Sequence, residues 1–319
     1  LNRRHSFQSQ APFTTPQSDN IWPTDWTDGR ERGGTRPGLG STTHSPGNDP
    51  YNWCKVNWSS GSASLSGIAV THSGGTSVSI NGTSWDERIL TAPASTFSSC
   101  TVYQQTLYQA SFGHSPIYSY DLIGGGGASS NLTADQDEGT APVFCGLIHA
   151  WGDRLVVAGY KATPHIVTMC RVGDVTDWDV TETDASSAFS NAGGADGNQI
   201  SEPISSLISH SEDCLIVGCT DSMYAIRGNP SAGGFKRSIS HSVGPLSHSA
   251  WCKTGNDYTV FLSRNGLASI RPGCGEAPVS MSRESLPVEL MDIDVGEPGD
   301  TGKDRVAIGY DRVFRGIHI

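Results

Sequence analysis

The chain has 319 residues, a formal net charge of −11 at pH 7 and only 17% charged residues. Its 38 Gly and 17 Pro residues favour frequent turns over long helices, because both residue types disfavour helix interiors. No apolar stretch approaches the roughly 20 residues that cross a bilayer, and the acidic balance argues against a dedicated nucleic-acid binder, which would carry a basic face.

Residues 1–50 predict an extended N-terminal arm. They are polar and rich in Pro, Thr and Gly, and Trp22 and Trp26 are set among them. We expect these two tryptophans to pack onto another surface. The first residues show no signal-peptide pattern.

Residues 51–142 predict a second, β-rich region. Alternation such as Ser77-Val78-Ser79-Ile80 is typical of short strands, and segment 101–122 resembles a degenerate form of the repeat that follows it. This region is therefore either a small inserted domain or a degenerate propeller blade.

A repeated unit occupies residues 143–319. Segments 147–160, 207–218 and 249–262 each contain a short strand, a polar turn ending in Asp153, Asp213 or Asp257, and an apolar strand. A further strand follows each one. A period of about 40–50 residues with several short strands per unit is typical of a β-propeller. Segment 305–319 begins the pattern and stops after two strands, so the last blade is incomplete unless an N-terminal strand or further chain closes it.

The eight cysteines predict buried thiols and no metal site. No C-x-x-C pair occurs, so a zinc site is not expected. Cys214, Cys219 and Cys252 lie in apolar runs, where cysteine behaves as a small hydrophobic residue. Eight cysteines could form up to four disulfides, but we favour free buried thiols, and we expect no cofactor.

Known catalytic motifs are absent. The sequence contains no P-loop, no G-x-S-x-G and no H-E-x-x-H. One catalytic option remains, which is a pair of carboxylates. The candidates are Asp174, Asp177 and Asp179 around Trp178, and the pair Asp292 and Asp294. Asp177 and Asp179 could face one side of a strand and meet a sugar or Ca²⁺. The favoured interpretation is that these aspartates close turns.

Arginine outnumbers lysine 16 to 5. Arginine makes planar, bidentate contacts and is enriched in protein interfaces, so this excess indicates either permanent assembly or the base composition of the genome.

Several stretches resemble the propeller-bearing structural proteins of tailed-bacteriophage virions. The similar stretches run in order along the chain and cover about residues 29–40 and 143–319. They are Gly29 to Leu39, Arg154 to Gly159, Cys170 to Asp179, Ile226 to Gly234, Val243 to Pro245 and Phe261 to Leu267.

The resemblance implies a virion tail component. In short-tailed phages such subunits form a homohexameric nozzle around the DNA exit channel and meet the adaptor and the fibres. DNA would be only passing cargo, and an acidic chain suits that role because it repels phosphate. The resemblance brings no catalytic residues, no metal and no membrane insertion.

Under this interpretation the chosen residues have architectural roles. Arm and interface contacts are expected from Arg30, Arg32, Arg36, Trp22 and Trp26. Tight turns are expected at Gly33, Gly34, Pro37, Gly38, Gly228, Asn229 and Pro230. Trp151, Trp178 and Trp251 are expected to fill the core between blades.

Two other functions stay open. One is a carbohydrate- or receptor-binding propeller that stacks sugars on Trp and Tyr side chains. The less favoured one is a glycoside hydrolase or lyase that uses Asp177 and Asp179.

Overall fold

The computed structural model describes residues 50–60, 63–72, 75–79, 86–89, 98–114, 116–123, 129–192, 200–273, 275–281, 306–311 and 316–318. The chain divides into two compact units, residues 1–43 and residues 44–319, and every described residue belongs to the second. The predicted arm therefore lies outside the described residues, except for Pro50, which begins the first strand.

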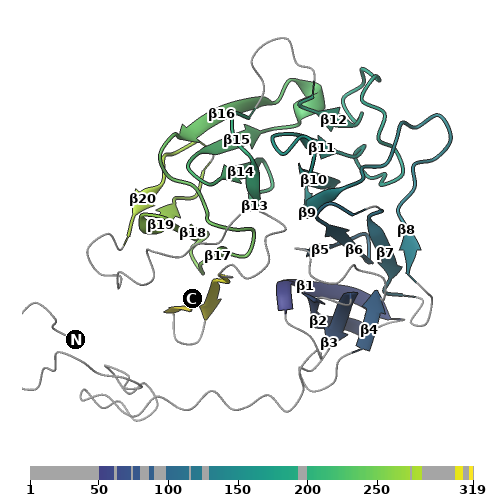
Figure 1. Cartoon of the computed structure of the whole chain (residues 1–319), viewed down its shortest axis with the longest axis horizontal. Coiled ribbons are helices and arrows are strands. Elements are labelled where there is room, and N and C mark those ends of the chain that lie inside the picture. Colours follow the sequence, from purple (N-terminus) through teal and green to yellow (C-terminus); the bar gives the residue numbers. More distant parts are fainter. Residues whose placement is uncertain are drawn as a thin grey trace, which may run out of the picture. The chain divides into compact units, whose positions relative to one another are not determined.

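The described residues form five four-stranded antiparallel sheets and one two-stranded sheet, and the strands of each sheet follow sequence order (Figure 1). The first two sheets come from the β-rich region 51–142. They consist of β1 (Pro50–Ser60), β2 (Ala63–His72), β3 (Gly75–Ser79) and β4 (Asp86–Ile89), and of β5 (Ser98–Tyr103), β6 (Thr106–Ser111), β7 (Tyr118–Asp121) and β8 (Ser130–Asn131).

The remaining sheets come from the region of the predicted repeats. The third contains β9 (Cys145–Trp151), β10 (Arg154–Tyr160), β11 (Val167–Met169) and β12 (Phe189–Ser190). The fourth contains β13 (Ile204–Ser211), β14 (Cys214–Cys219), β15 (Met223–Arg227) and β16 (Phe235–Ser240). The fifth contains β17 (Trp251–Lys253), β18 (Thr259–Ser263), β19 (Gly266–Ile270) and β20 (Val279–Ser280), and the sixth contains β21 (Gly309–Asp311) and β22 (Gly316–His318).

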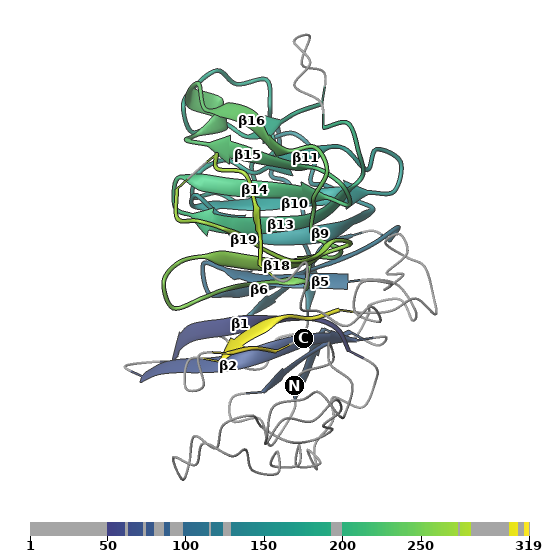
Figure 2. The same ribbon diagram turned by 90° about the vertical axis from the view of Figure 1, so that its left-hand side faces the viewer.

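Each hydrophobic cluster draws its side chains from two consecutive sheets. Val56 and Ala69 of the first sheet pack with Leu107 and Tyr120 of the second. The next four seams are represented by Tyr108 with Ile148, Leu147 with Leu207, Ile208 with Phe261, and Leu262 with Ile308. A blade buries its faces only against its neighbours, so this arrangement confirms the predicted all-β propeller. Figure 1 shows the third and fourth sheets side by side, Figure 2 shows them one behind the other, and β9 and β10 both contact β13.

The three tryptophans expected between blades lie at these seams. Trp151 belongs to the cluster between the third and fourth sheets, and its indole N–H donates to the Ser211 carbonyl at 2.9 Å. Trp178 is buried in the cluster between the second and third sheets. Trp251 is partly buried against the cluster between the fourth and fifth sheets.

Tight hairpins join the inner strands of the blades. Arg154 pairs with Trp151, which leaves Gly152 and Asp153 as a two-residue loop with φ values of 58° and 54°. Two positive φ values match the type I′ turn, whose twist suits a hairpin, and glycine and aspartate tolerate that conformation. The predicted turn ending in Asp153 is confirmed.

The cysteines differ from expectation at one position. Cys100, Cys145, Cys170, Cys219 and Cys252 are free and buried, as expected, and Cys54 is free and half-buried. The favoured expectation of a free thiol is wrong for Cys214, which is disulfide-bonded. An apolar run does not reveal a disulfide, because burial suits a thiol and a disulfide equally.

Gly244 leads from the fourth sheet to the fifth and lies against backbone. A Cβ at this position would stand 1.9 Å from the Cys219 carbonyl oxygen and 2.9 Å from that of Ser222. We expect Gly244→Ala to lower the free energy of unfolding by about 1–3 kcal/mol, because backbone in a paired hairpin cannot move aside cheaply. Urea unfolding measures this. Gly255→Ala is the control, because the nearest atom to its Cβ would be a Tyr310 ring carbon at 3.6 Å; an equal loss there would contradict the steric explanation.

No helix in the described part of the chain is both long enough and apolar enough to span a membrane.

Candidate functional site

The seam between the third and fourth blades contains a buried polar network. At its centre is Arg154, the first residue of β10, whose side chain is 1% exposed. One guanidinium nitrogen donates to the Cys170 carbonyl at 2.8 Å and to the Ser187 carbonyl at 2.6 Å. The other donates to Asn229 Oδ1 at 2.9 Å and to Ser231 Oγ at 3.3 Å. A single side chain thus links β10 to the loops after β11 and to the fourth blade.

The predicted turn residues Gly228, Asn229 and Pro230 lie between β15 and β16. Gly228 has a φ of 69°, and Asn229 caps the short 3₁₀ helix η2 (Pro230–Ala232) by accepting the Ser231 amide. The Asn229 side-chain amide donates to the Ala185 carbonyl of the third blade. Asn229 therefore both closes its own turn and holds two blades together.

The carboxylates around Trp178 are engaged in turns. Asp174 Oδ1 accepts the Thr176 amide at 2.9 Å, Asp177 Oδ1 accepts the Asp179 amide at 2.9 Å, and Asp179 Oδ1 accepts the Thr181 amide at 2.8 Å. These bonds to Thr176 and Thr181 hold the pKa values of Asp174 and Asp179 below their usual range. Both therefore stay ionised near neutral pH, which does not suit a general acid.

Asp177 also belongs to an ion-pair network. Its second oxygen lies 3.5 Å from Arg171, which also pairs with Asp184 at 2.8 Å and with Glu182. Asp292 and Asp294, the other candidate pair, lie outside the described residues. The described carboxylates thus act as turn and network residues, and among the described residues no group of three or more His, Cys, Asp or Glu side chains could hold a metal ion.

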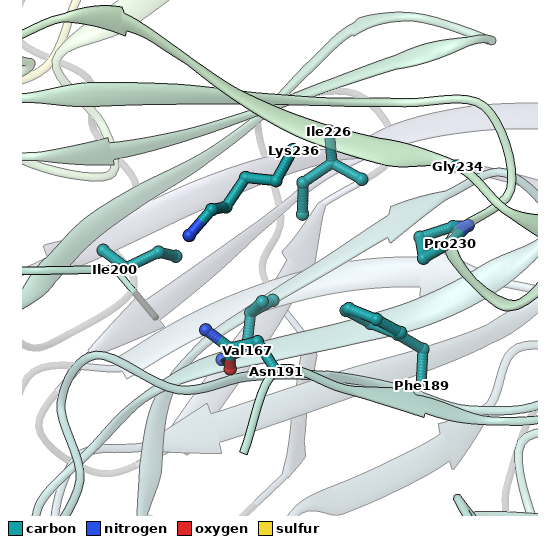
Figure 3. A pocket seen from close by; sticks show the side chains of 8 residues that line it. All are labelled: Val167, Phe189, Asn191, Ile200, Ile226, Pro230, Gly234 and Lys236. Carbon is teal, nitrogen blue, oxygen red and sulfur yellow. Dashed lines mark hydrogen bonds between the residues drawn. The ribbon is translucent and has the colours of Figure 1, made fainter. Parts of the chain in front are cut away.

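A small pocket lies beside this network, between the third and fourth blades (Figure 3). Its volume is about 60 Å³, and its walls include Val167, Phe189, Ile226 and Pro230. Lys236 projects toward Ile200 and Asn191, and its ammonium lies 5.1 Å from the centre of the Tyr224 ring. Burial lowers the pKa of Lys236. Pockets for drug-sized ligands measure ≈ 300–1,000 Å³, so this one suits a few waters or a single small group.

Two histidines, the half-buried His149 and the buried His248, meet close to β9 and β17. The ring centroid of His149, on β9, lies 5.9 Å from that of His248 and 6.0 Å from that of Trp251, on β17. His248 Nδ1 accepts the Leu207 amide at 3.3 Å, whereas His149 Nε2 is buried with no hydrogen-bond partner in the described structure. Burial lowers the pKa of His149 to about 4 and that of His248 to about 3. Both rings are therefore neutral at pH 7.

One face of the first sheet exposes apolar side chains. Trp53 on β1 is 47% exposed and Ile68 on β2 is 45% exposed. The strand register pairs Lys55 with Ile68, and Trp53 is two residues from Lys55, so all three side chains lie on the same side of the sheet. We call Trp53, Lys55, Asn57 and Ile68 the first-sheet face. The opposite side of β1 carries Val56, which is buried against the second blade.

The predicted arm residues lie outside the described part of the chain. They are Trp22, Trp26, Arg30, Arg32, Gly33, Gly34, Arg36, Pro37 and Gly38.

No protein-family model matches the chain, and no curated protein matches it. Among solved structures, similar chains include the extracellular domain of BT4673 from B. thetaiotaomicron, at 12% identity and a TM-score of 0.49, with 79% of this chain and 29% of that chain covered. PorZ, a surface component of the type-IX secretion system of Porphyromonas gingivalis, is 10% identical with a TM-score of 0.47, covering 75% of this chain and 35% of that one. Kluyveromyces lactis Hsv2 is 8% identical with a TM-score of 0.41, covering 69% of each chain.

The chain spans about a third of the length of the two bacterial structures. At these TM-scores, the similarities to solved structures do not support a statement about function. The structures named here are not phage proteins, so the resemblance to tailed-phage proteins stays a prediction.

Sequence reasoning did not assign a role to Arg154 or to the first-sheet face. The signal that could have found Arg154 is an arginine at the start of an otherwise apolar strand, because a charge in that position needs partners when the strand is buried. The alternate positions of Trp53, Lys55 and Asn57 could have indicated one face of a strand. It could not show that this face stays exposed.

Proposed function

We propose that this protein is a non-catalytic β-propeller that works by binding other macromolecules. The observation that carries the proposal is the first-sheet face, where Trp53 and Ile68 lie half-exposed beside Lys55. Aromatic residues are enriched in protein interfaces, and apolar groups exposed side by side on one sheet mark a contact surface. The turn-bound carboxylates and the small pocket support a role other than catalysis.

Within this class we propose a structural subunit of a phage virion, in the tail, with a second copy of the chain seated on the first-sheet face. The ordered resemblance of residues 29–40 and 143–319 supports this proposal. The hexameric ring, the adaptor and fibre partners, and the passage of DNA belong to the same proposal.

The test is the native mass of the full chain by light scattering during size-exclusion chromatography. We expect a discrete multiple of 33.8 kDa, and we expect Trp53→Ser with Ile68→Ser to shift the protein toward the monomer. Val279→Ser is the matched control, because Val279 on β20 is 50% exposed but lies on another blade. A wild-type protein that stays monomeric at high concentration would overturn the self-assembly proposal.

Trp53 also favours a second candidate, a glycan- or receptor-binding propeller. An exposed indole beside Lys55 and Asn57 offers a stacking face together with polar groups. A glycan array probed with the wild-type chain and with Trp53→Ser separates the two candidates. Binding that disappears in Trp53→Ser supports the glycan-binding candidate, and an array without signal removes it.

A further inference from the structure

Two cysteines from consecutive blades approach each other at the seam between the first and second sheets. Cys54 lies on β1 and Cys100 on β5, and the two strands pack against each other. Their sulfur atoms are 3.1 Å apart, although the residues are 46 positions apart in the chain. A disulfide bond has an S–S distance of ≈ 2.03–2.05 Å, so closing the gap requires a shift of about 1 Å.

We propose that Cys54 and Cys100 form a reversible disulfide that joins the first blade to the second when the protein meets an oxidised small-molecule thiol. The proposal does not depend on the function proposed above. It concerns a site where the fold, and not the sequence spacing, brings two thiols into contact.

The two sulfurs differ in solvent exposure and in protonation, and therefore in their roles in thiol–disulfide exchange. Cys54 is half-buried and can be approached from solvent, whereas Cys100 is 3% exposed. The Cys54 side chain and burial raise the pKa of Cys100 well above its usual value, so Cys100 remains a thiol. Cys54 is therefore the attacking group, and Cys100 is the resolving group.

Oxidised glutathione is the oxidant that accounts for the electrons and protons of this step. The Cys54 thiolate attacks one sulfur of the glutathione disulfide, which forms a mixed disulfide and releases one glutathione thiolate. Cys100 then loses its proton and attacks the Cys54 sulfur, which releases the second glutathione thiolate. The protein thiols lose two protons and two electrons in total, and the glutathione disulfide gains them to become two thiols.

Other free cysteines in the described structure lack such a neighbour. Cys145 and Cys252 are buried, the Cys170 sulfur accepts the Leu155 amide at 3.0 Å, and the Cys219 sulfur lies 3.6 Å from the Glu202 carbonyl oxygen. Burial raises the pKa of Cys145 to about 12 and that of Cys252 to about 11. Oxidation is therefore expected to select the pair Cys54 and Cys100.

The consequence is a covalent link across a blade seam. Closing a loop of 46 residues restricts the unfolded chain and stabilises the folded one. The first blade, which carries the first-sheet face, would be fixed to the second in the oxidised form.

The test compares the full chain equilibrated with oxidised or with reduced glutathione. After oxidation, alkylation and proteolysis without reductant, mass spectrometry should find a peptide pair joined through Cys54 and Cys100. The same sample should show alkylated Cys252. The melting temperature of the oxidised form should exceed that of the reduced form by about 5 °C or more.

Matched variants separate this link from the disulfide of Cys214, which reduction also breaks. Cys54→Ser should lower the difference in melting temperature between the two forms, whereas Cys252→Ser should leave it unchanged. The proposal is overturned if both Cys54 and Cys100 are alkylated after oxidation, if Cys54 carries only glutathione, or if either one pairs with a different cysteine.

Discussion

Replacing Arg154 with methionine is expected to lower the free energy of unfolding by about 3–5 kcal/mol. Methionine fills a similar space but donates no hydrogen bonds, so the carbonyls of Cys170 and Ser187 lose their guanidinium donor inside the protein. The link to Asn229 in the fourth blade is lost as well. The loss should appear as a lower urea concentration at the midpoint of unfolding. Far-UV circular dichroism of the β-sheets monitors the unfolding.

Two variants make this prediction specific. Arg227→Met is the matched control, because Arg227 pairs with Asp213 at 3.2 Å with both side chains more than half exposed, and exposed pairs contribute little. Arg154→Lys keeps the charge but loses the planar fork, so its stability should lie between the wild type and Arg154→Met. Equal effects of Arg154→Met and Arg227→Met would show that the network does not hold the blades together.

Acidification is expected to destabilise the protein between about pH 6.5 and pH 4 through His149 and His248. In the folded state their pKa values are about 4 and about 3, below the ordinary value of about 6.5 that they regain on unfolding. As the pH falls below 6.5, the unfolded chain binds protons that the folded chain does not, so folding stability decreases. Above pH 6.5 the two neutral histidines contribute their full share to the free energy of unfolding. By pH 4, His149 alone accounts for a loss of about 3 kcal/mol of that free energy.

The geometry explains why the folded protein resists protonation. His248 Nδ1 already accepts the Leu207 amide, so a proton on that nitrogen would place two N–H groups face to face. His149 is half-buried next to His248, its Nε2 atom is buried, and the positive charge of Lys253 also disfavours its protonation. Desolvation disfavours a positive charge on either ring, and the neighbouring groups that add to the effect are Lys253 for His149 and His149 for His248.

Unfolding free energies measured by urea titration from pH 7.5 to pH 4.5 test this prediction. His248→Asn, whose side-chain oxygen can accept the Leu207 amide, and His149→Phe should each flatten the dependence on pH. His241→Asn is the control, because His241 is exposed. A variant that carries both His248→Asn and His149→Phe completes the series. If its unfolding free energy depends on pH as steeply as that of the wild type, other groups cause the acid sensitivity.

The propeller was predictable because its signals are local. Asp153 and Asp257 end turns at positive φ, and the apolar runs after them become β10 and β18, so spacing along the chain was enough to find the repeated unit. The turn at Gly228, Asn229 and Pro230 was predictable for the same reason, since its residues satisfy their own backbone. The aspartates around Trp178 were correctly expected to close turns, because each bonds an amide two residues away.

The contacts between blades were decided only by the tertiary structure. Arg154 meets Asn229 across 75 positions, Cys54 meets Cys100 across 46, and His149 meets His248 although they lie on different blades. No local pattern encodes such a meeting, because it depends on how the sheets stack around one another. The sequence by itself determined the strands and the turns, since these depend on residues a few positions apart. The tertiary structure determined which polar groups are buried together and which face of the first sheet remains exposed, because burial depends on neighbours that are distant in the chain.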